Sequence, residues 1–99
     1  MKTLFYEVIV CYDVENNKIR TKLFDALRDF GLIPIQKSVF WGHVNNAEYK
    51  AIFREFNQKL NSTTDKAFVV KTRLKAHLQK SGFGYNDYDL PEWKDYETV

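Results

Sequence analysis

The chain has 99 residues, 44% hydrophobic and 28% charged, which is the size of one folded domain and excludes a wholly disordered chain. No apolar run approaches the roughly 20 residues that span a membrane, and the single cysteine, Cys11, excludes an internal disulfide framework, so we expect a cytoplasmic protein. Residues 1–80 carry 14 Lys and Arg against eight Asp and Glu, a net charge of +6, whereas residues 81–99 carry one Lys and five acids, a net charge of −4. A basic body suits a polyanionic partner and an acidic tail suits a basic protein surface, although both can simply be solvated.

The first two predicted elements are a strand and a helix. Leu4 to Val14 alternates between two faces that are both largely apolar, which is typical of a central strand covered on both sides. Asp13 lies at the C-terminal end of this strand. From Lys18 to Phe30 the apolar residues follow helical spacing, and Asn16 or Asn17 can cap the start of that helix.

A second strand and a second helix follow. Ile33 to Val44 alternates again and predicts one strand, in which Pro34 favours an edge position or a strand start. Asn45 and Glu48 have the spacing of a capping box. The helix that follows is predicted to bury one apolar face, made of Tyr49, Ile52, Phe53, Phe56 and Leu60.

The C-terminal third completes the predicted fold. Ala67 to Leu74 predicts a further strand, and Lys75 to Gln79 is compatible with another short one. The order favours an α+β, ferredoxin-like sandwich of βαββαβ type, with an antiparallel sheet and two helices on one face. The other sheet face needs its own cover, and a second copy of the chain is the economical candidate, giving a homodimer through the sheets. We assign residues 1–80 to this domain and residues 81–99 to an acidic, aromatic tail that lies against another surface.

Few residues carry a catalytic signature. His43 and His77 are isolated, and Cys11 lies inside a strand with no base nearby, so nucleophilic catalysis is disfavoured. Asp13 remains, at a position where α/β sites usually form. One carboxylate is a poor magnesium site, but a two-fold axis near the strand ends would bring two copies of Asp13 together to share an ion. Asp13 can equally bond the loop amides before the helix, and its position leaves both roles open.

Candidates for nucleic-acid contacts are basic and aromatic. The basic side chains lie on or near the first helix and on the second strand: Lys18, Arg20, Lys22, Arg28 and Lys37. They can neutralise phosphates or form an ordinary solvated face. Phe40 and Trp41 can stack on bases or close the core, and at least one is expected in the core because strand neighbours face opposite ways. Ser38 can offer its hydroxyl to a phosphate or fill a tight sheet position.

Three segments together resemble the CRISPR-associated protein 2 family: Tyr12-Asp13-Val14, the helix with Arg20 and Leu27 before Gly31, and Gln36-Lys37-Ser38-Val39-Phe40. The resemblance covers roughly residues 4–74. It implies a ferredoxin-like homodimer that acts in spacer acquisition, placed between two dimers of the CRISPR integrase (CRISPR-associated protein 1) and holding double-stranded spacer-precursor DNA. It also implies a C-terminal strand that crosses to the partner protomer, so residues 81–99 are expected to serve a dimer swap or partner docking.

The resemblance further implies magnesium-dependent endonuclease activity on RNA or DNA. Asp13 is then the catalytic residue and the metal ligand, with Mg²⁺ shared by the Asp13 residues of two subunits. Tyr12, Arg20, Ser38 and Phe40 match motif positions near that site. The full set of expected nucleic-acid contacts is Tyr12, Lys18, Arg20, Lys22, Lys37, Ser38 and Phe40, with double-stranded DNA as the first partner and single-stranded RNA as a second.

Two classes of function follow, a scaffold and a nuclease. A site with one acid and no evident general base favours the scaffold as the main role, with cleavage as an additional activity. The alternative is a stand-alone, toxin-like ribonuclease of the same fold that needs no integrase. An RNA-binding RRM is disfavoured because the chain lacks the Lys/Arg-Gly-aromatic signature of its RNA-stacking strand.

Overall fold

The computed structural model describes residues 3–85, 90 and 97–98. The elements, in chain order, are β1 (Leu4–Asp13), α1 (Asn17–Asp29), β2 (Ile33–Gln36), β3 (Val39–Val44), α2 (Asn46–Lys59), β4 (Lys66–Lys71), α3 (Leu74–Ser81) and β5 (Glu97–Thr98). The first six form the predicted βαββαβ unit. None of the helices in the described part of the chain is long and apolar enough to cross a membrane.

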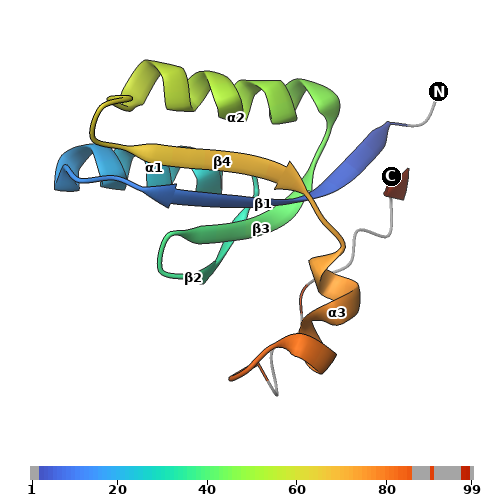
Figure 1. Ribbon diagram of the computed structural model, residues 1–99. Coiled ribbons are helices and arrows are strands. Elements are labelled where there is room, and N and C mark those ends of the chain that lie inside the picture. The colour runs from blue at the N-terminus through green and yellow to red at the C-terminus, as the bar shows by residue number, and fades with distance from the viewer. Residues whose placement is uncertain (1–2, 86–89, 91–96, 99) are drawn as a thin grey trace.

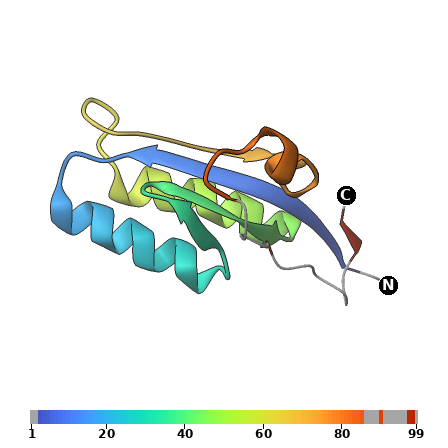
Figure 2. The ribbon, with the colours of Figure 1, turned by 90° about the horizontal axis from the view of Figure 1, so that it is seen from below.

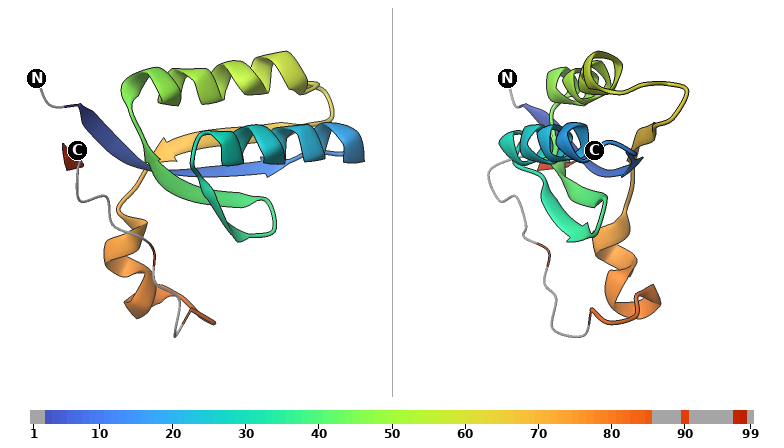
Figure 3. Two further views of the ribbon diagram at one scale, coloured as in Figure 1. Left: turned by 180° about the vertical axis from the view of Figure 1, so that it is seen from behind. Right: turned by 90° about the vertical axis from the view of Figure 1, so that its left-hand side faces the viewer.

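The sheet has β1 at its centre. The strand order is β2-β3-β1-β4, every neighbouring pair in that path is antiparallel, and β5 pairs in parallel with the start of β1. Helices α1 and α2 cover one face, while α3 lies on the opposite side (Figures 1 and 3). The predicted fold class, an antiparallel sheet with two helices on one face, is therefore confirmed.

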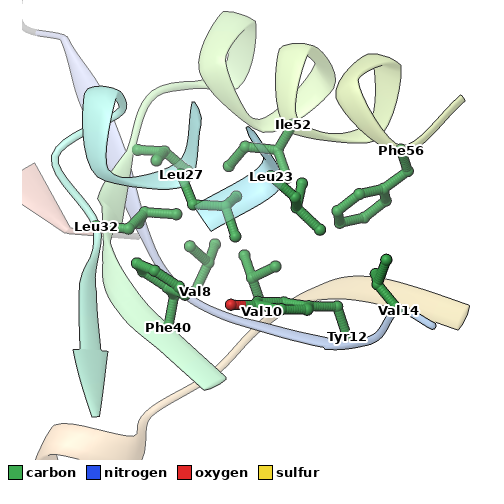
Figure 4. Close-up of a cluster of buried hydrophobic side chains, with 11 residues drawn as sticks. Val8, Val10, Tyr12, Val14, Leu23, Leu27, Leu32, Phe40, Ile52 and Phe56 are labelled. Atoms are coloured by element: carbon green, nitrogen blue, oxygen red, sulfur yellow. The ribbon is translucent and has the colours of Figure 1, made fainter. Parts of the chain in front are cut away.

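The main core lies between the sheet and these two helices. Alternate residues of β1 face it, because side chains of a strand point to opposite sides in turn. Its buried members come from β1, α1, β3, α2 and two loops (Figure 4): Val8, Val10, Tyr12, Val14, Leu23, Leu27, Leu32, Phe40, Val44, Ile52 and Phe56. Each large apolar side chain buried here contributes about 1.5–3 kcal/mol, so this layer holds both helices on the sheet.

Helix α3 covers part of the second face. Trp41 and Leu78 are buried there together with Leu90, and Ile9 and Ile33 pack against them. Figure 2 shows α3 beside the strands on the side away from α2. The cover expected from a second copy is therefore partly supplied by the chain itself.

A buried carboxylate joins β1 to α3. Glu7 is only 8% exposed, and its Oε2 accepts hydrogen bonds from Trp41 Nε1 and from the backbone N–H of Lys75, both at 2.9 Å. The backbone N–H of Thr72 donates to Glu7 O. A carboxylate at the first turn of a helix satisfies amides that have no partner within the helix, so Glu7 fixes where α3 begins.

The helix boundaries follow the capping residues in the sequence. Asn16 Oδ1 accepts from the Ile19 N–H at the start of α1, and Asn45 and Glu48 form the complete capping box at the start of α2. Gly31 follows α1 with φ +84°, a left-handed conformation that favours glycine. The predicted caps are confirmed, and the predicted ends of α1 agree with the structure to within a residue or two.

The predicted strand over residues 33–44 is wrong, because it is a hairpin. It turns at Lys37–Ser38, and β2 and β3 pair antiparallel with an irregular register between Pro34 and Gln36. Ser38 sits at φ +93°, where a non-glycine residue is uncommon. The alternation of apolar residues continues through the turn, so the pattern carries no sign of the reversal.

The predicted strand over residues 75–79 is also wrong. These residues belong to α3, and β4 ends at Lys71 instead of Leu74. Much of the predicted tail, residues 86–89, 91–96 and 99, lies outside the described residues. Of the rest, Leu90 is buried, and the Tyr85 hydroxyl accepts from Gln36 Nε2 at 2.8 Å and donates to Ile35 O at 3.2 Å.

Candidate nucleic-acid and metal site at the end of β1

The candidate site lies where β1 ends. Asp13 is the last residue of the strand and its side chain is exposed. The β2–β3 turn lies beside it, because the Tyr12 N–H donates to Ser38 O at 3.1 Å, and Lys66 of β4 is paired across the ladder with Asp13. We call this region the Asp13 edge and define it by Asp13, Lys37, Ser38 and Lys66 (left-hand side of Figure 1).

Arg20 connects this edge to the start of α1. Its Nη1 donates to Val14 O at 2.8 Å, and its Nη2 donates to Asn17 Oδ1. The guanidinium is partly exposed, and these two hydrogen bonds hold the loop after Asp13 in place. Arg20 is therefore at the site the sequence predicted, with a structural role there as well.

Tyr12 lies beneath the edge. Burial raises the pKa of its phenol, whereas a hydrogen bond with the Ser38 side chain and the charge of Arg20 act in the opposite direction. These three predicted residues are thus brought together around one hydroxyl group. Because Tyr12 itself is mostly buried, we assign its ring to the core and its hydroxyl to the orientation of Ser38.

Phe40 requires a correction. Its ring is 0% exposed and packs against Tyr12, with ring centroids 6.2 Å apart, and against Phe24 at 5.0 Å. A ring enclosed on all sides offers no face to a base. Its prediction as a nucleic-acid contact is therefore replaced by a core role, the alternative that the residue pattern left open.

Asp65 is a structural residue beside the site that the sequence did not reveal. Its Oδ1 accepts from the Glu15 N–H and its Oδ2 accepts from the Asn61 N–H, each at 3.0 Å. These two backbone hydrogen bonds are the main cause of its lowered pKa. A turn around residues 61–66 is visible in the sequence, but nothing there indicates a partner fifty positions away.

This finding bears directly on Asp13. The alternative for Asp13 was that its carboxylate bonds the loop amides before α1. Asp65 and Asn16 perform that task, and the described residues give the Asp13 carboxylate no hydrogen bond or ion pair. An exposed carboxylate without such a role is available to a ligand.

A magnesium site at Asp13 would need ligands from more than the described part of one chain. Among the described residues, no group of three or more His, Cys, Asp and Glu side chains is placed to hold an ion. Magnesium takes six oxygen ligands and commonly keeps several waters while it binds one or two carboxylates. The exposed Asp13 carboxylate would suit one such ligand position, and a second carboxylate would have to be added, for which Asp13 of another copy is the simplest source.

The basic residues around the edge are well placed for phosphate. Lys18, Lys22 and Lys37 are exposed, as predicted, and the structure adds the exposed Lys66. Cys11 and His43 differ from them, because burial raises the pKa of the Cys11 thiol and lowers that of the His43 imidazole. Neither group is poised as a thiolate or a cation, so the edge is an electrostatic site without an evident protein nucleophile.

Comparison with known proteins identifies relatives of this chain. The family model described as CRISPR associated protein Cas2 matches residues 6–81. The chain is 44% identical over 95 residues to CRISPR-associated endoribonuclease Cas2 1 of Francisella tularensis subsp. novicida, an alignment covering 94% of this chain and 95% of the relative. It is 36% identical over 80 residues to a protein with the same description from Methanospirillum hungatei, covering 68% of this chain and 84% of the relative.

Solved structures agree on the fold. Cas2 of Streptococcus pyogenes, crystallised at pH 6.5, superposes with a TM-score of 0.66 and 24% identity, covering 79% of this chain and 99% of that one. A hypothetical protein of Thermus thermophilus gives a TM-score of 0.64 at 22% identity, covering 69% of this chain and 82% of that one. At such low identity the likeness concerns the fold alone.

Proposed function

The chain belongs to the family of CRISPR-associated protein Cas2, and from this premise we propose that it is the nucleic-acid-binding subunit of a complex that acquires CRISPR spacers. In this role it is a homodimer that holds double-stranded spacer-precursor DNA for the CRISPR integrase. The contacts are sequence-independent and go to phosphates. The basic residues of this proposal are Lys18, Lys22, Lys37 and Lys66.

The observation that carries the proposal is the Asp13 edge. Lys66 of β4 is paired with Asp13, and the β2–β3 turn that carries Lys37 is bonded to Tyr12. Helix α1, which carries the exposed Lys18 and Lys22, begins at Asn17, shortly after the end of β1. Phosphate contacts supply most of the affinity for nucleic acid that is bound without sequence preference. A scaffold needs these charges and a fixed geometry, and it needs no catalytic group.

The sheet face without α1 and α2 supports the proposed dimer. On β4, Phe68 and Val70 are 52% and 43% exposed and lie opposite Cys11 and Ile9 of β1. α3 leaves these side chains uncovered. A second copy related by two-fold symmetry is the economical partner for such a face and would bring the two Asp13 edges into one assembly.

Duplex binding over a range of salt concentrations tests the scaffold. Replacing Lys18, Lys22 and Lys37 by Gln should weaken binding and lower the slope of log affinity against log salt by about 2.7, since each phosphate contact contributes about 0.9. The control replaces Lys59 by Gln, because this lysine is paired with Glu55 on α2. An unchanged slope in the triple variant would reject Lys18, Lys22 and Lys37 as phosphate contacts.

A metal-dependent endonuclease is the second candidate, favoured by the unengaged carboxylate of Asp13. In a dimer, the two Asp13 side chains would hold Mg²⁺, which supplies an activated water and charge stabilisation at the scissile phosphate. Arg20 and Ser38 would orient the phosphate beside them. The relatives from Francisella tularensis and Methanospirillum hungatei are named endoribonucleases, so RNA is the first substrate to test and DNA the second.

The variant Asp13→Ala separates the two roles, with Asp25→Ala as a matched control because Asp25 is exposed on α1 and outside the edge. We expect Asp13→Ala to retain duplex binding and integration and to lose magnesium-dependent cleavage. Loss of integration in a folded Asp13→Ala protein would contradict a scaffold-only role. Failure to co-purify with the integrase would favour the stand-alone ribonuclease.

A further inference from the structure

The backbone amide of Glu15 lies in the loop between β1 and α1, two residues after Asp13. An Asp side chain commonly accepts a hydrogen bond from the N–H two positions further along the chain, in an Asx-turn, so Asp13 is the local acceptor for this amide. In the structure, the Glu15 N–H donates instead to Asp65 Oδ1, at 3.0 Å and from fifty positions away in the sequence. The exposed Asp13 carboxylate accepts no hydrogen bond within the described part of the chain.

Asp65 is held ready for this contact by the loop that precedes β4. Asp65 is only 8% exposed, its Oδ2 accepts from the Asn61 N–H at 3.0 Å, and Thr64 Oγ1 donates to its Oδ1 at 3.3 Å. The loop folds back on itself, since the Asp65 N–H donates to Asn61 O at 2.8 Å. A carboxylate fixed by several partners loses little conformational freedom when it accepts one more hydrogen bond, which favours it over a mobile competitor.

The other backbone groups around Asp13 are also engaged from elsewhere in the fold. The Tyr12 N–H donates to Ser38 O of the β2–β3 turn, at 3.1 Å. Val14 O accepts from Arg20 Nη1 of α1, at 2.8 Å. The β2–β3 turn, α1 and the loop before β4 therefore hold the chain on both sides of Asp13, and none of these contacts uses the Asp13 side chain.

From these observations we propose that Asp65 is a positioning residue, which keeps the Asp13 carboxylate turned outward by occupying the amide that Asp13 would otherwise bind. Without Asp65, the partly buried Glu15 N–H has no acceptor, and Asp13 turns back to supply one. The inference deepens the proposed function and rests on it for the role of Asp13 as a metal ligand. Asp65 itself contacts neither the ion nor the substrate.

The alternative is that Asp65 only ties two loops together. Either role makes the removal of its carboxylate destabilising, so the stability of the single variant does not separate them. They differ in what Asp13 does afterwards. Competition predicts that Asp13 acquires a structural hydrogen bond, whereas a simple tie leaves Asp13 exposed and without effect on stability.

A double-mutant cycle on the metal-free protein distinguishes the two. It comprises the parent, Asp13→Ala, Asp65→Ala and the double variant, each unfolded in urea with EDTA at one fixed protein concentration, because assembly adds to stability. Asp13→Ala should shift the midpoint little in the parent and lower it clearly in the Asp65→Ala background. Repulsion between the two carboxylates would couple them with the same sign, so the cycle is repeated at about 1 M salt, where such repulsion is screened.

Mn²⁺, which accepts oxygen ligands as Mg²⁺ does, reports on Asp13 directly through the broadening of nearby amide signals in NMR spectra. In Asp65→Ala, the apparent affinity for Mn²⁺ should fall about tenfold, the lower end of the range for residues that orient metal ligands. Thr64→Ala is the matched control, because it removes a hydrogen bond to the same carboxylate and leaves the Glu15 amide paired. Asn45→Ala controls for general loss of stability, since its capping box lies at the start of α2. Both controls should bind Mn²⁺ as the parent does.

An additive cycle at high salt would overturn the inference, and so would an unchanged Mn²⁺ affinity in folded Asp65→Ala. If Asp65→Ala does not fold, Asp65→Asn takes its place in the cycle, because it keeps an acceptor for one of the two amides and should give a smaller coupling of the same sign. A parent protein that binds no Mn²⁺ at Asp13 would reject the proposed metal site, and the cycle would still decide the role of Asp65.

Discussion

Removing the Glu7 carboxylate should destabilise the protein strongly and release α3 first. In Glu7→Ala, the Trp41 indole N–H and the Lys75 backbone N–H both lose their acceptor in a buried place. An unsatisfied buried donor costs about 1–3 kcal/mol, so the two together should lower the free energy of unfolding by about 3 kcal/mol. A chain of 99 residues has a total stability of roughly 5–15 kcal/mol, which makes this loss a large share.

The assay is urea denaturation followed by circular dichroism at one fixed protein concentration, together with amide hydrogen exchange. Exchange at Lys75 should accelerate more than exchange at Val10 in the centre of the sheet, because the lost contacts hold α3 and not the ladder. Glu7→Gln keeps an oxygen acceptor and should lose less stability than Glu7→Ala.

The matched control is Glu55→Ala, which removes a half-buried acid paired with Lys59 one helical turn away. Such a pair contributes about 0.3–0.5 kcal/mol. If Glu7→Ala and Glu55→Ala shift the denaturation midpoint equally, the anchoring role of Glu7 is refuted.

Three further predictions concern stability. Asn45→Ala should lower the free energy of unfolding by about 1 kcal/mol, measured by urea denaturation, because the capping box of α2 loses its amide acceptor. The pKa of Asp65 is lowered in the folded state, so its ionised carboxylate stabilises the fold at pH values above its ordinary pKa of 3.8, and this stabilisation is lost as the pH falls through the lower pKa of the folded state. Asp65→Asn should therefore lose less stability between pH 5 and pH 2 than the parent chain does. Burial lowers the pKa of His43 below 6.5, so on acidification the imidazole is protonated in the unfolded chain before it is protonated in the folded one. The stability of the protein should therefore decline as the pH falls below about 6.5. Thermal melts should show a shallower decline for His43→Gln, and His77→Gln is the control because His77 is exposed. A parallel decline in both histidine variants and the parent would contradict the last of these.

Local patterns account for most of the fold. The alternation in β1, the helical spacing of α1 and the Asn45–Glu48 capping box each depend on neighbours a few positions apart, and the structure confirms all three. The reversal at Lys37–Ser38 escaped prediction because the turn lacks glycine and the alternation runs through it. Phe53 has a core pattern and lies exposed, because the pattern of a helix does not tell where the sheet beneath it ends.

The amino-acid sequence by itself determined the alternation of strands and helices as far as β4, except for the reversal between β2 and β3. It also determined the faces of β1, the caps of both long helices and the place of Asp13 at a strand end, since each follows from periodicity and from the chemistry of adjacent residues. The tertiary structure alone decided which carboxylate serves the backbone and which stays unengaged. Asp65 reaches the Glu15 amide from fifty residues away, Glu7 reaches the start of α3 across 68 residues, and Phe40 is enclosed by Tyr12 and Phe24. Contacts of that range depend on how strands and helices stack, and no local pattern in the chain encodes them.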